Sequence, residues 1–197
     1  MKPDGSTVGL GRYLLFWSIA LCGVTFDLVT KSIVFSKLGP PEARNIHSVV
    51  PHILDLRTSH NMGALWGFGA SIPYSSLIFA GLSVIAVLAI LYYLFVAGAA
   101  SHRVLTIALG LIMAGAMGNC YDRLAFGYVR DFVYFRVEPI GFECAIFNFA
   151  DNMLVAGAIT LVLYALRPEK EPTEPTSSDE QAGVASLIGR SDLDHTS

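Results

Sequence analysis

Four stretches of predominantly apolar residues alternate with polar segments along the chain. The apolar stretches cover residues 13–35, 75–100, 104–121 and 146–166, and the longest polar segment between them covers residues 36–74. Each apolar stretch is close to the length of about 20 residues that an α-helix needs to cross a bilayer. The pattern predicts an all-α integral membrane protein with four transmembrane helices.

Two shorter patterns add detail to this picture. Residues 129–137, VRDFVYFRV, are dense in β-branched and aromatic side chains, which predicts a short strand. An open strand edge is not tolerated in lipid, so we expect this β-containing element at the membrane interface or against protein. In the third apolar stretch, Gly110, Ala114 and Gly118 recur at intervals of four, which predicts a helix face for close packing.

The composition supports lipid as the main solvent of the chain. Of the 197 residues, 53% are hydrophobic and 15% are charged, whereas a soluble domain is about 25% charged. A chain of this length has too little interior to bury so much apolar surface in one globule. The same balance excludes a disordered chain, a nucleic-acid binder with a basic face and a disulfide scaffold.

Charge is divided unevenly between the two ends of the chain. Residues 168–197 hold seven acidic and two basic side chains, a net charge of −5, so residues 1–167 carry +2 of the formal total of −3. The segment 168–197 is also rich in Pro, Ser and Thr, which predicts an acidic disordered tail after a membrane-embedded domain at 1–167. Four spans place both termini on one side. Basic residues occur on both sides, so charge alone leaves the orientation open.

The cysteines and histidines match no metal-binding spacing. The chain has three cysteines, Cys22, Cys120 and Cys144, and three histidines in its long polar segment, His47, His52 and His60. Neither a CxxC nor an HExxH motif occurs, so we expect no metal site. Cys120 and Cys144 both lie on the loop-rich side and could meet, but a buried and unpaired role is favoured for all three thiols.

Ionisable residues inside apolar stretches are costly and therefore informative. Asp27 and Lys31 lie four residues apart in the first stretch, share a helix face and are expected to pair. Asn119, Asp122 and Arg123 lie at the end of the third stretch. The adjacent opposite charges of Asp122 and Arg123 fit a polar cap where that helix leaves the membrane.

The fourth stretch opens with three polar residues on one helix face, Asn148, Asp151 and Asn152. No basic residue follows before Arg167, so Asp151 needs a partner from another element or a proton. The available partners are other carboxylates and the arginines of the same side. Two close aspartates would share one proton, as in an aspartic protease. A proton relay or an ion pathway fits the same spacing, so both alternatives stay open at this point.

Five pieces of sequence occur in order across residues 13–166. They are Asp27 with Thr30-Lys31, Asn61-Met62-Gly63-Ala64, Gly118-Asn119-Cys120-Tyr121-Asp122-Arg123, Val129-Arg130-Asp131-Phe132 and Phe147-Asn148-Phe149-Ala150-Asp151. Together, and at this spacing around four apolar stretches, the pieces resemble the lipoprotein signal peptidase family (signal peptidase II).

The resemblance implies a bacterial inner-membrane aspartic endopeptidase with four spanning helices and both termini in the cytoplasm. It places the long polar segments, and with them the site, on the extracytoplasmic side. The implied substrates are prolipoproteins whose lipobox cysteine already carries diacylglyceryl, cleaved just before that cysteine. Membrane lipid is the other implied contact. The resemblance implies neither a cofactor nor nucleic acid, and no obligate protein partner is evident.

Carried over residue by residue, the catalytic pair of the family falls on Asp131 and Asp151. Asp122 is expected to be a structural ion-pair member, because Arg123 lies beside it. The resemblance further implies polar groups that line the site and contact substrate backbone, at Asn61, Gly63, Asn119, Arg123 and Asn148, and support from Asp27 and Lys31 on the first helix.

The chain departs from the family pattern at three places. Leu65-Trp66 follow Ala64 where a small residue and Phe are usual, Leu28 stands where Gln is frequent, and the C-terminal tail is long. The first two are expected to alter the groove for the lipid or signal peptide without touching the aspartates.

Two further hypotheses compete with the peptidase. A small transporter would use Asp27, Lys31 and Asp151 as a polar path and predicts internal repeat symmetry, which the two halves lack. A purely structural membrane partner leaves the clustered Asn and Asp residues unexplained.

Overall fold

The computed structural model describes residues 9–64 and 67–167. The acidic tail expected at 168–197 and the Leu65-Trp66 departure lie outside the described residues. The helices are α1 (Leu10–Leu38), α2 (Ser75–Phe95), α3 (Arg103–Phe126) and α4 (Phe149–Ala165), with short 3-10 helices η1 (Pro41–Ala43), η3 (Ala99–Ser101) and η4 (Glu138–Ile140). The strands are β1 (Ile46–Val50), β2 (Leu54–Asn61), β3 (Val129–Val137) and β4 (Phe142–Glu143).

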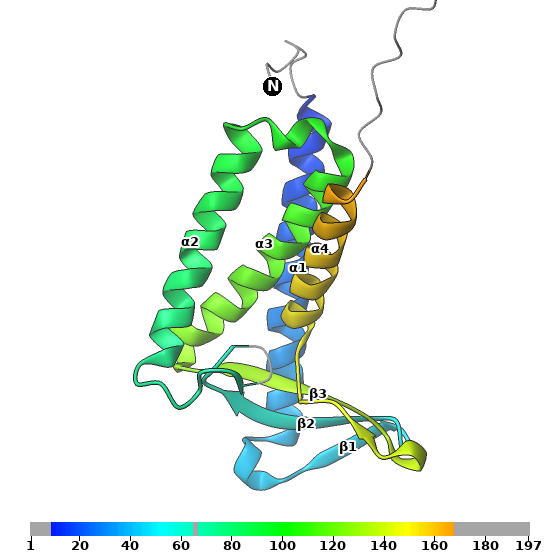
Figure 1. The fold of residues 1–197 in the computed structure, drawn as a ribbon. Helices are drawn as coiled ribbons and strands as arrows, with labels where there is room; N and C mark the ends of the chain where they lie inside the picture. The colour runs from blue at the N-terminus through cyan, green and yellow to red at the C-terminus, as the bar shows by residue number, and fades with distance from the viewer. Residues whose placement is uncertain (1–8, 65–66, 168–197) are drawn as a thin grey trace, which may run out of the picture. The chain divides into compact units, whose positions relative to one another are not determined.

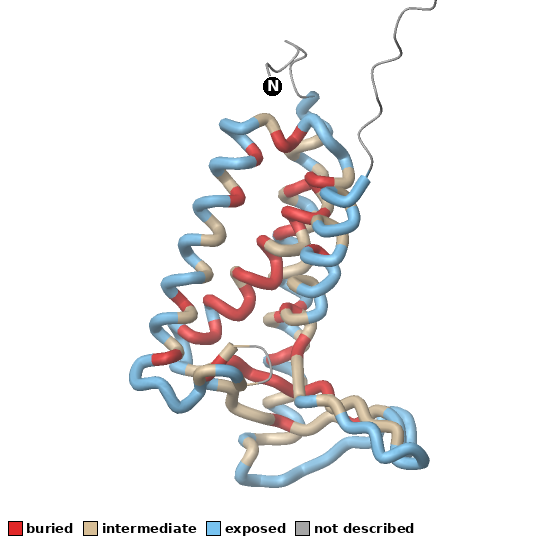
Figure 2. The backbone as a smooth tube through the Cα atoms, viewed as in Figure 1, coloured by how far each residue is buried: buried red, intermediate tan, exposed pale blue. Residues whose placement is uncertain are grey.

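Helix α3 is the centre of the helical part of the molecule. It packs against α1, α2 and α4, and it is the most buried of the four helices (Figures 1 and 2). The first turn of α1 and the last turn of α4 lie at the end of the bundle away from the sheet (Figure 1). The strands therefore meet only one end of the helices, where α3 leads into β3.

The small-residue face predicted on the third helix packs against α1. A Cβ atom on Gly110 would lie 3.2 Å from the Cβ of Ile19, and one on Gly118 would lie 2.5 Å from Asp27 Oδ2. Ala114 faces Gly23 of α1 in the same way. The absence of larger side chains lets the two helix backbones approach closely, as in other membrane helix pairs.

The outer faces of the helices are apolar and exposed. Large hydrophobic side chains project outward from α1, α2 and α4, including Leu21, Leu88 and Leu163, each more than half exposed. Within the described residues, three helices, α1, α2 and α3, are long and apolar enough to cross a membrane, and α4 is an apolar helix of 17 residues. The fold is therefore mostly helical, of membrane type, with a small antiparallel sheet.

Several helix boundaries differ from the predicted ones. The second helix ends at Phe95 rather than at residue 100, because the chain turns at Gly98 with a φ of 76°. The third continues past residue 121 to Phe126, so its polar end is helical. The fourth begins at Phe149, not at 146, so Asn148 precedes the helix on which we expected it.

The four strands form one antiparallel sheet in the order β1-β2-β3-β4. The strand predicted at 129–137 is confirmed as β3, whose first five residues are buried. The register between β2 and β3 shifts between Leu56 and Ser59, which indicates a β-bulge. All of β1 is exposed, so only the inner strands lie under the helices.

The cysteines are not paired. Cys120 and Cys144 are both free thiols, so the pairing that the sequence left open does not form. Cys120 is buried as expected, Cys144 is half-buried, and Cys22 is exposed on α1. The expectation of a buried Cys22 was wrong because the outer face of an apolar helix faces outward in this fold.

Candidate active site

Asp131 lies at the buried start of β3, directly after the turn that follows α3. Its side chain is 2% exposed. Its two carboxyl oxygens accept hydrogen bonds from Asn148 Nδ2 at 2.6 Å and Asn61 Nδ2 at 3.0 Å. Burial, followed by the negative charge of Asp151, raises the pKa of Asp131 from its ordinary value of 3.8 to about 7. This carboxyl group is therefore set to hold a proton near neutral pH.

Asp151 lies in the first turn of α4. The Asn148 side chain accepts a hydrogen bond from the Asp151 backbone N–H at 3.0 Å, and the Asp151 side chain accepts one from the Asn148 N–H at 3.2 Å. This reciprocal pair is a capping box, which satisfies two backbone donors that every helix start leaves free. The cap fixes the direction in which the Asp151 carboxylate points.

Asn148 joins the two aspartates. It is fully buried, and it contacts Asp131 through its side-chain amide and Asp151 through both its side chain and its backbone. The two acids therefore flank one buried side chain, and the negative charge of Asp151 is, after burial, the second cause of the raised pKa of Asp131. The structure thus brings together the two acids that the resemblance implied as the catalytic pair.

Asn119 of α3 completes the amide network around the pair. Its Nδ2 donates to Asp151 Oδ1 at 2.8 Å, and its Oδ1 accepts from Lys31 Nζ at 3.0 Å and from Asn148 Nδ2 at 3.2 Å. Lys31 also pairs with Asp27 Oδ2 at 2.7 Å, as the spacing on the first helix predicted. The carboxylates are therefore held by neutral amides, and Lys31 contacts this network through Asn119 rather than through either acid.

Arg123 and Gly63 connect α3 to the segment after β2. Arg123 Nη2 donates to the Gly63 carbonyl at 2.7 Å, and the Gly63 N–H donates to Asn61 Oδ1 at 2.9 Å. A Cβ atom at position 63 would lie 2.5 Å from the Phe68 carbonyl oxygen, so only glycine fits there. These contacts orient the Asn61 amide toward Asp131.

Asp122 belongs to a buried ion-pair network away from the two acids. It is fully buried and lies 2.8 Å from Arg130 Nη2 and 3.2 Å from Lys31 Nζ. The expected ion-pair role therefore has different partners: the neighbouring Arg123 turns to Gly63 instead. Adjacent residues on a helix point about 100° apart, which is why Asp122 and Arg123 do not face each other.

Sequence reasoning missed Arg130. Its Nε and backbone N–H both donate to Asp122, at 3.1 and 3.0 Å, and its guanidinium stacks over Phe126. The alternation of a strand was a usable signal, because it places Arg130 and Asp131 on opposite faces of β3. Asp27 also does more than pair with Lys31, since its Oδ1 accepts the Ala150 N–H at 2.8 Å and so ties α1 to the start of α4.

The histidines lie apart from the aspartates in roles of their own. His60 stacks between Phe35 and Tyr128, and His52 pairs with Glu138. The part of the chain that the structure describes contains no cluster of three His, Cys, Asp or Glu side chains suited to a metal ion. The arrangement around Asp131 and Asp151 offers two carboxyl groups that contact one buried amide side chain, with the pKa of Asp131 raised to about 7.

Residues 19–167 match a family model described as signal peptidase (SPase) II. The chain belongs to the signal peptidase II family. A lipoprotein signal peptidase of Rhodopirellula baltica is 33% identical over 191 residues, covering 91% of this chain and 84% of the relative. One from Staphylococcus aureus strain JH9 is 32% identical over 156 residues, covering 79% and 90%.

Two solved structures of bacterial membrane enzymes have a fold similar to that of this chain. A bacterial membrane enzyme determined by the in meso method at 2.3 Å is 29% identical, with a TM-score of 0.71 over 82% of this chain and 93% of the other. A second, at 1.9 Å, is 30% identical with a TM-score of 0.66 over 78% and 94%. Signal peptidase II enzymes are proteases, so Asp131 and Asp151 are candidates for the catalytic residues of a protease.

Proposed function

We propose that this protein is an aspartic endopeptidase of the bacterial inner membrane. It removes the signal peptide from diacylglyceryl-modified prolipoproteins and cleaves just before the lipidated cysteine. Membership of the signal peptidase II family supports the substrate class. The observation that carries the aspartic mechanism is the pair Asp131 and Asp151, held together by the buried Asn148.

The two carboxyl groups act as general acid and general base on one water molecule. One ionised carboxylate takes a proton from the water as its oxygen attacks the scissile carbonyl carbon. The protonated partner then donates its proton to the departing amine, so the pair ends with one proton as it began. The amides of Asn61, Asn119 and Asn148 hold the carboxyl groups in position without neutralising them. The mechanism requires neither a metal nor a covalent intermediate.

Arg123 and the surrounding amides are proposed to hold the substrate backbone near the pair. Arg123 is 7% exposed and has no carboxylate within 4 Å among the described residues. Its contacts are the carbonyls of Gly63 and Asn119 and the ring of Phe79. A buried guanidinium beside the site favours a substrate carbonyl oxygen on which negative charge develops.

The proposed membrane placement follows the four helices. Helix α4 has 17 residues, the lower end of the usual range for a span, and we infer that it crosses together with α1, α2 and α3. Four crossings put both termini on one side, which we infer from the family resemblance to be the cytoplasm. The sheet with Asp131, and the start of α4 with Asp151, then lie at the extracytoplasmic surface. The membrane-embedded domain is 1–167, followed by the acidic tail at 168–197. The transporter hypothesis is not favoured, because the family is one of proteases.

The full chain, purified in detergent with added lipid, tests this function directly. A synthetic precursor carrying diacylglyceryl on its lipobox cysteine is expected to be cut just before that cysteine, and the same peptide without lipid is expected to stay intact. Addition of a chelator is expected to leave the rate unchanged. Equal cleavage of the lipid-free peptide, or cleavage at another bond, would contradict the assignment.

A further inference from the structure

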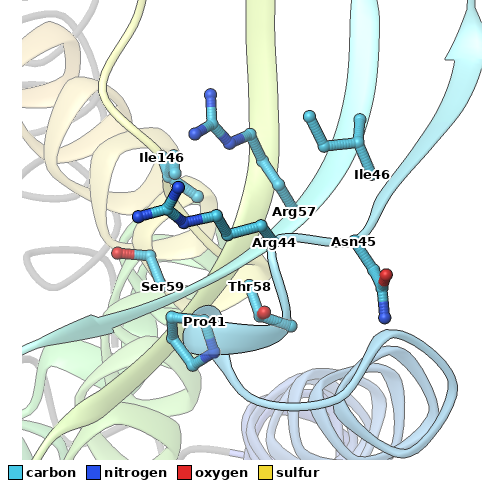
Figure 3. Close-up of a pocket in the computed structure, with 8 residues that line it drawn as sticks. All are labelled: Pro41, Arg44, Asn45, Ile46, Arg57, Thr58, Ser59 and Ile146. Atoms are coloured by element: carbon cyan, nitrogen blue, oxygen red, sulfur yellow. The ribbon is translucent and has the colours of Figure 1, made fainter.

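A cavity with two arginines in its lining lies against the sheet, next to Ser59, the strand partner of Asp131. It has a volume of about 500 Å³. Two arginines, three small polar residues and three apolar ones line it: Arg44, Arg57, Asn45, Thr58, Ser59, Pro41, Ile46 and Ile146 (Figure 3). Figure 3 shows the Arg44 and Arg57 side chains extending over the sheet from two different segments, the loop after η1 and strand β2.

The two arginines of this cavity have no carboxylate of their own. Arg130 and Arg136 of β3 each pair with an aspartate, at 2.8 and 3.0 Å. Within residues 9–64 and 67–167, neither Arg44 nor Arg57 lies within 4 Å of a carboxylate, although Arg57 stacks over the ring of Tyr134. Two guanidinium groups beside hydroxyl and amide side chains form a receptor for an anion.

The backbone holds Arg44 in place at some cost. Its φ of 54° lies in the left-handed region, which side chains other than Gly, Asn and Asp rarely adopt. Arg44 closes η1 in this conformation through its backbone N–H, which donates to the Pro41 carbonyl at 3.1 Å. The turn thus places the Arg44 guanidinium in the cavity, although a glycine at this position would adopt the same backbone conformation without strain.

One residue in the lining of the cavity is paired with a candidate catalytic residue. Ser59, which lines it, is the β2 residue opposite Asp131 of β3. Asn61, which donates to Asp131, lies two residues further along β2. Arg57 lies two residues before Ser59, within the β-bulge, so at about 3.3 Å per residue it is at most about 7 Å along the strand from Ser59.

We propose that this cavity binds an acidic side chain in the part of the precursor that follows the scissile bond. This inference rests on the proposed function. The signal peptide is apolar and stays along the helices in lipid, so the rest of the precursor leaves the aspartates over the sheet. An extended chain advances about 3.3 Å per residue, so two steps from Ser59 bring about the third residue after the cut to Arg57.

A lipid headgroup phosphate has chemistry similar to that of a carboxylate, but the position favours the peptide. The cavity is lined by β1, β2 and the loops beside them, and its Ser59 is the strand partner of Asp131. None of its lining residues lies on the outward apolar faces of α1, α2 or α4, where lipid chains would approach.

The experiment compares cleavage of three lipidated peptides by the full chain. The peptides differ only at the third residue after the cut, which is Asp, Asn or Lys. The wild type is expected to cleave the Asp peptide with a kcat/KM about tenfold above that of the Lys peptide, mainly through KM. In Arg44→Asn/Arg57→Gln the ratio is expected to fall below about twofold, and in Arg57→Glu the Lys peptide is expected to become the better substrate.

Lys37→Gln is the matched control, because it removes one positive charge from the exposed last turn of α1, outside the cavity. It is expected to keep the wild-type ratio. An Asp preference that survives in the double variant would overturn the proposal, as would equal cleavage of all three peptides by the wild type. If the wild type cleaves none of them, the proposed function itself fails. The arginine variants could instead lose the same fraction of kcat/KM with all three peptides, and only in phosphatidylglycerol vesicles. That result would assign the cavity to a headgroup phosphate.

Discussion

At the scale of single residues, Asp131 has the environment that a shared proton needs. It is almost fully buried, two amide groups contact its oxygens, and Asp151 lies close by. Two neighbouring carboxylates resist ionising together, so the proposed mechanism has the pair titrate as a unit and keep one proton over a range of pH. The pKa of about 7 for Asp131 sets the upper end of that range.

Activity should therefore fall on the alkaline side of neutrality. Above about pH 7 the pair loses the proton that the leaving amine requires, so kcat/KM on a lipidated peptide is expected to fall about tenfold for each pH unit. A pH–rate profile from pH 5 to 9 measures this. Asp122→Asn, which changes an acid outside the pair, is expected to keep the same alkaline limb. A wild-type profile that stays flat to pH 9 would contradict the shared proton.

The raised pKa also has a consequence for stability. In the unfolded chain Asp131 ionises near its ordinary pKa of 3.8, whereas in the folded protein it holds its proton until about pH 7. The folded state therefore binds more protons between these values, and its stability decreases as the pH rises through this window. The amide introduced by Asp131→Asn does not titrate, so the melting temperature of this variant relative to wild type is expected to increase from pH 5 to pH 8. A pH-independent difference between the two would contradict the shifted pKa.

At the scale of elements, the close contact between α1 and α3 depends on Gly118. A Cβ atom there would lie 2.5 Å from Asp27 Oδ2 and force the two helices apart. Gly118→Ala is expected to lower the free energy of unfolding by about 1–3 kcal/mol. Gly81→Ala on α2 is the control, since its Cβ meets no atom within 4 Å, and it is expected to stay within about 1 kcal/mol of wild type. Thermal unfolding in one detergent compares them, and equal effects of the two changes would count against this packing.

The sequence predicted the elements better than their ends. Hydropathy reports how apolar a segment is and not whether it is helical. The third helix was therefore predicted to end at residue 121, where the sequence becomes polar. It is helical to Phe126 because β3 buries Asp122 and supplies Arg130 as its partner. The apolar residues after Phe95 were assigned to a helix for the same reason, although Ala99 and Ala100 are buried in a 3-10 turn. The strand at 129–137 was predictable because its β-branched and aromatic density is strong over the whole segment.

At the scale of the whole molecule, a buried charge network joins α1, α3 and β3. Lys31 lies between Asp27 and Asp122, and Arg130 neutralises Asp122 from the strand. All three members on the helices are fully buried, so removal of the lysine leaves two carboxylates without their shared cation. The network thus couples the helices to the sheet that carries Asp131.

Loss of the central cation should be far more costly than loss of an exposed one. Lys31→Met is expected to lower the free energy of unfolding by about 3–5 kcal/mol. Lys37→Met, on the exposed last turn of the same helix, is expected to cost less than about 0.5 kcal/mol. Denaturant unfolding of both variants in one detergent makes the comparison. Similar losses for the two would show that the buried network does not carry this stability.

The sequence pointed to the residues of the candidate site but not to the hydrogen bonds that join them. Ionisable residues in apolar stretches are few, which directed attention to Asp27, Lys31 and Asp151. The role of Asn148 as the cap of α4 and the link between the acids depends on tertiary contacts across three elements. Likewise, the cavity of Arg44 and Arg57 exists only once the loop after η1 lies over β2, so no local pattern marks it.

The central claim is that Asp131 and Asp151 perform the cleavage, and single substitutions test it most directly. Asp131→Asn and Asp151→Asn are each expected to reduce cleavage of the lipidated precursor by at least about a thousandfold while the proteins stay folded, because each removes a required proton acceptor or donor. Asp122→Asn is expected to lose stability but to retain cleavage. Cleavage at the wild-type rate by either Asp131→Asn or Asp151→Asn, with complete loss in a folded Asp122→Asn, would contradict the account.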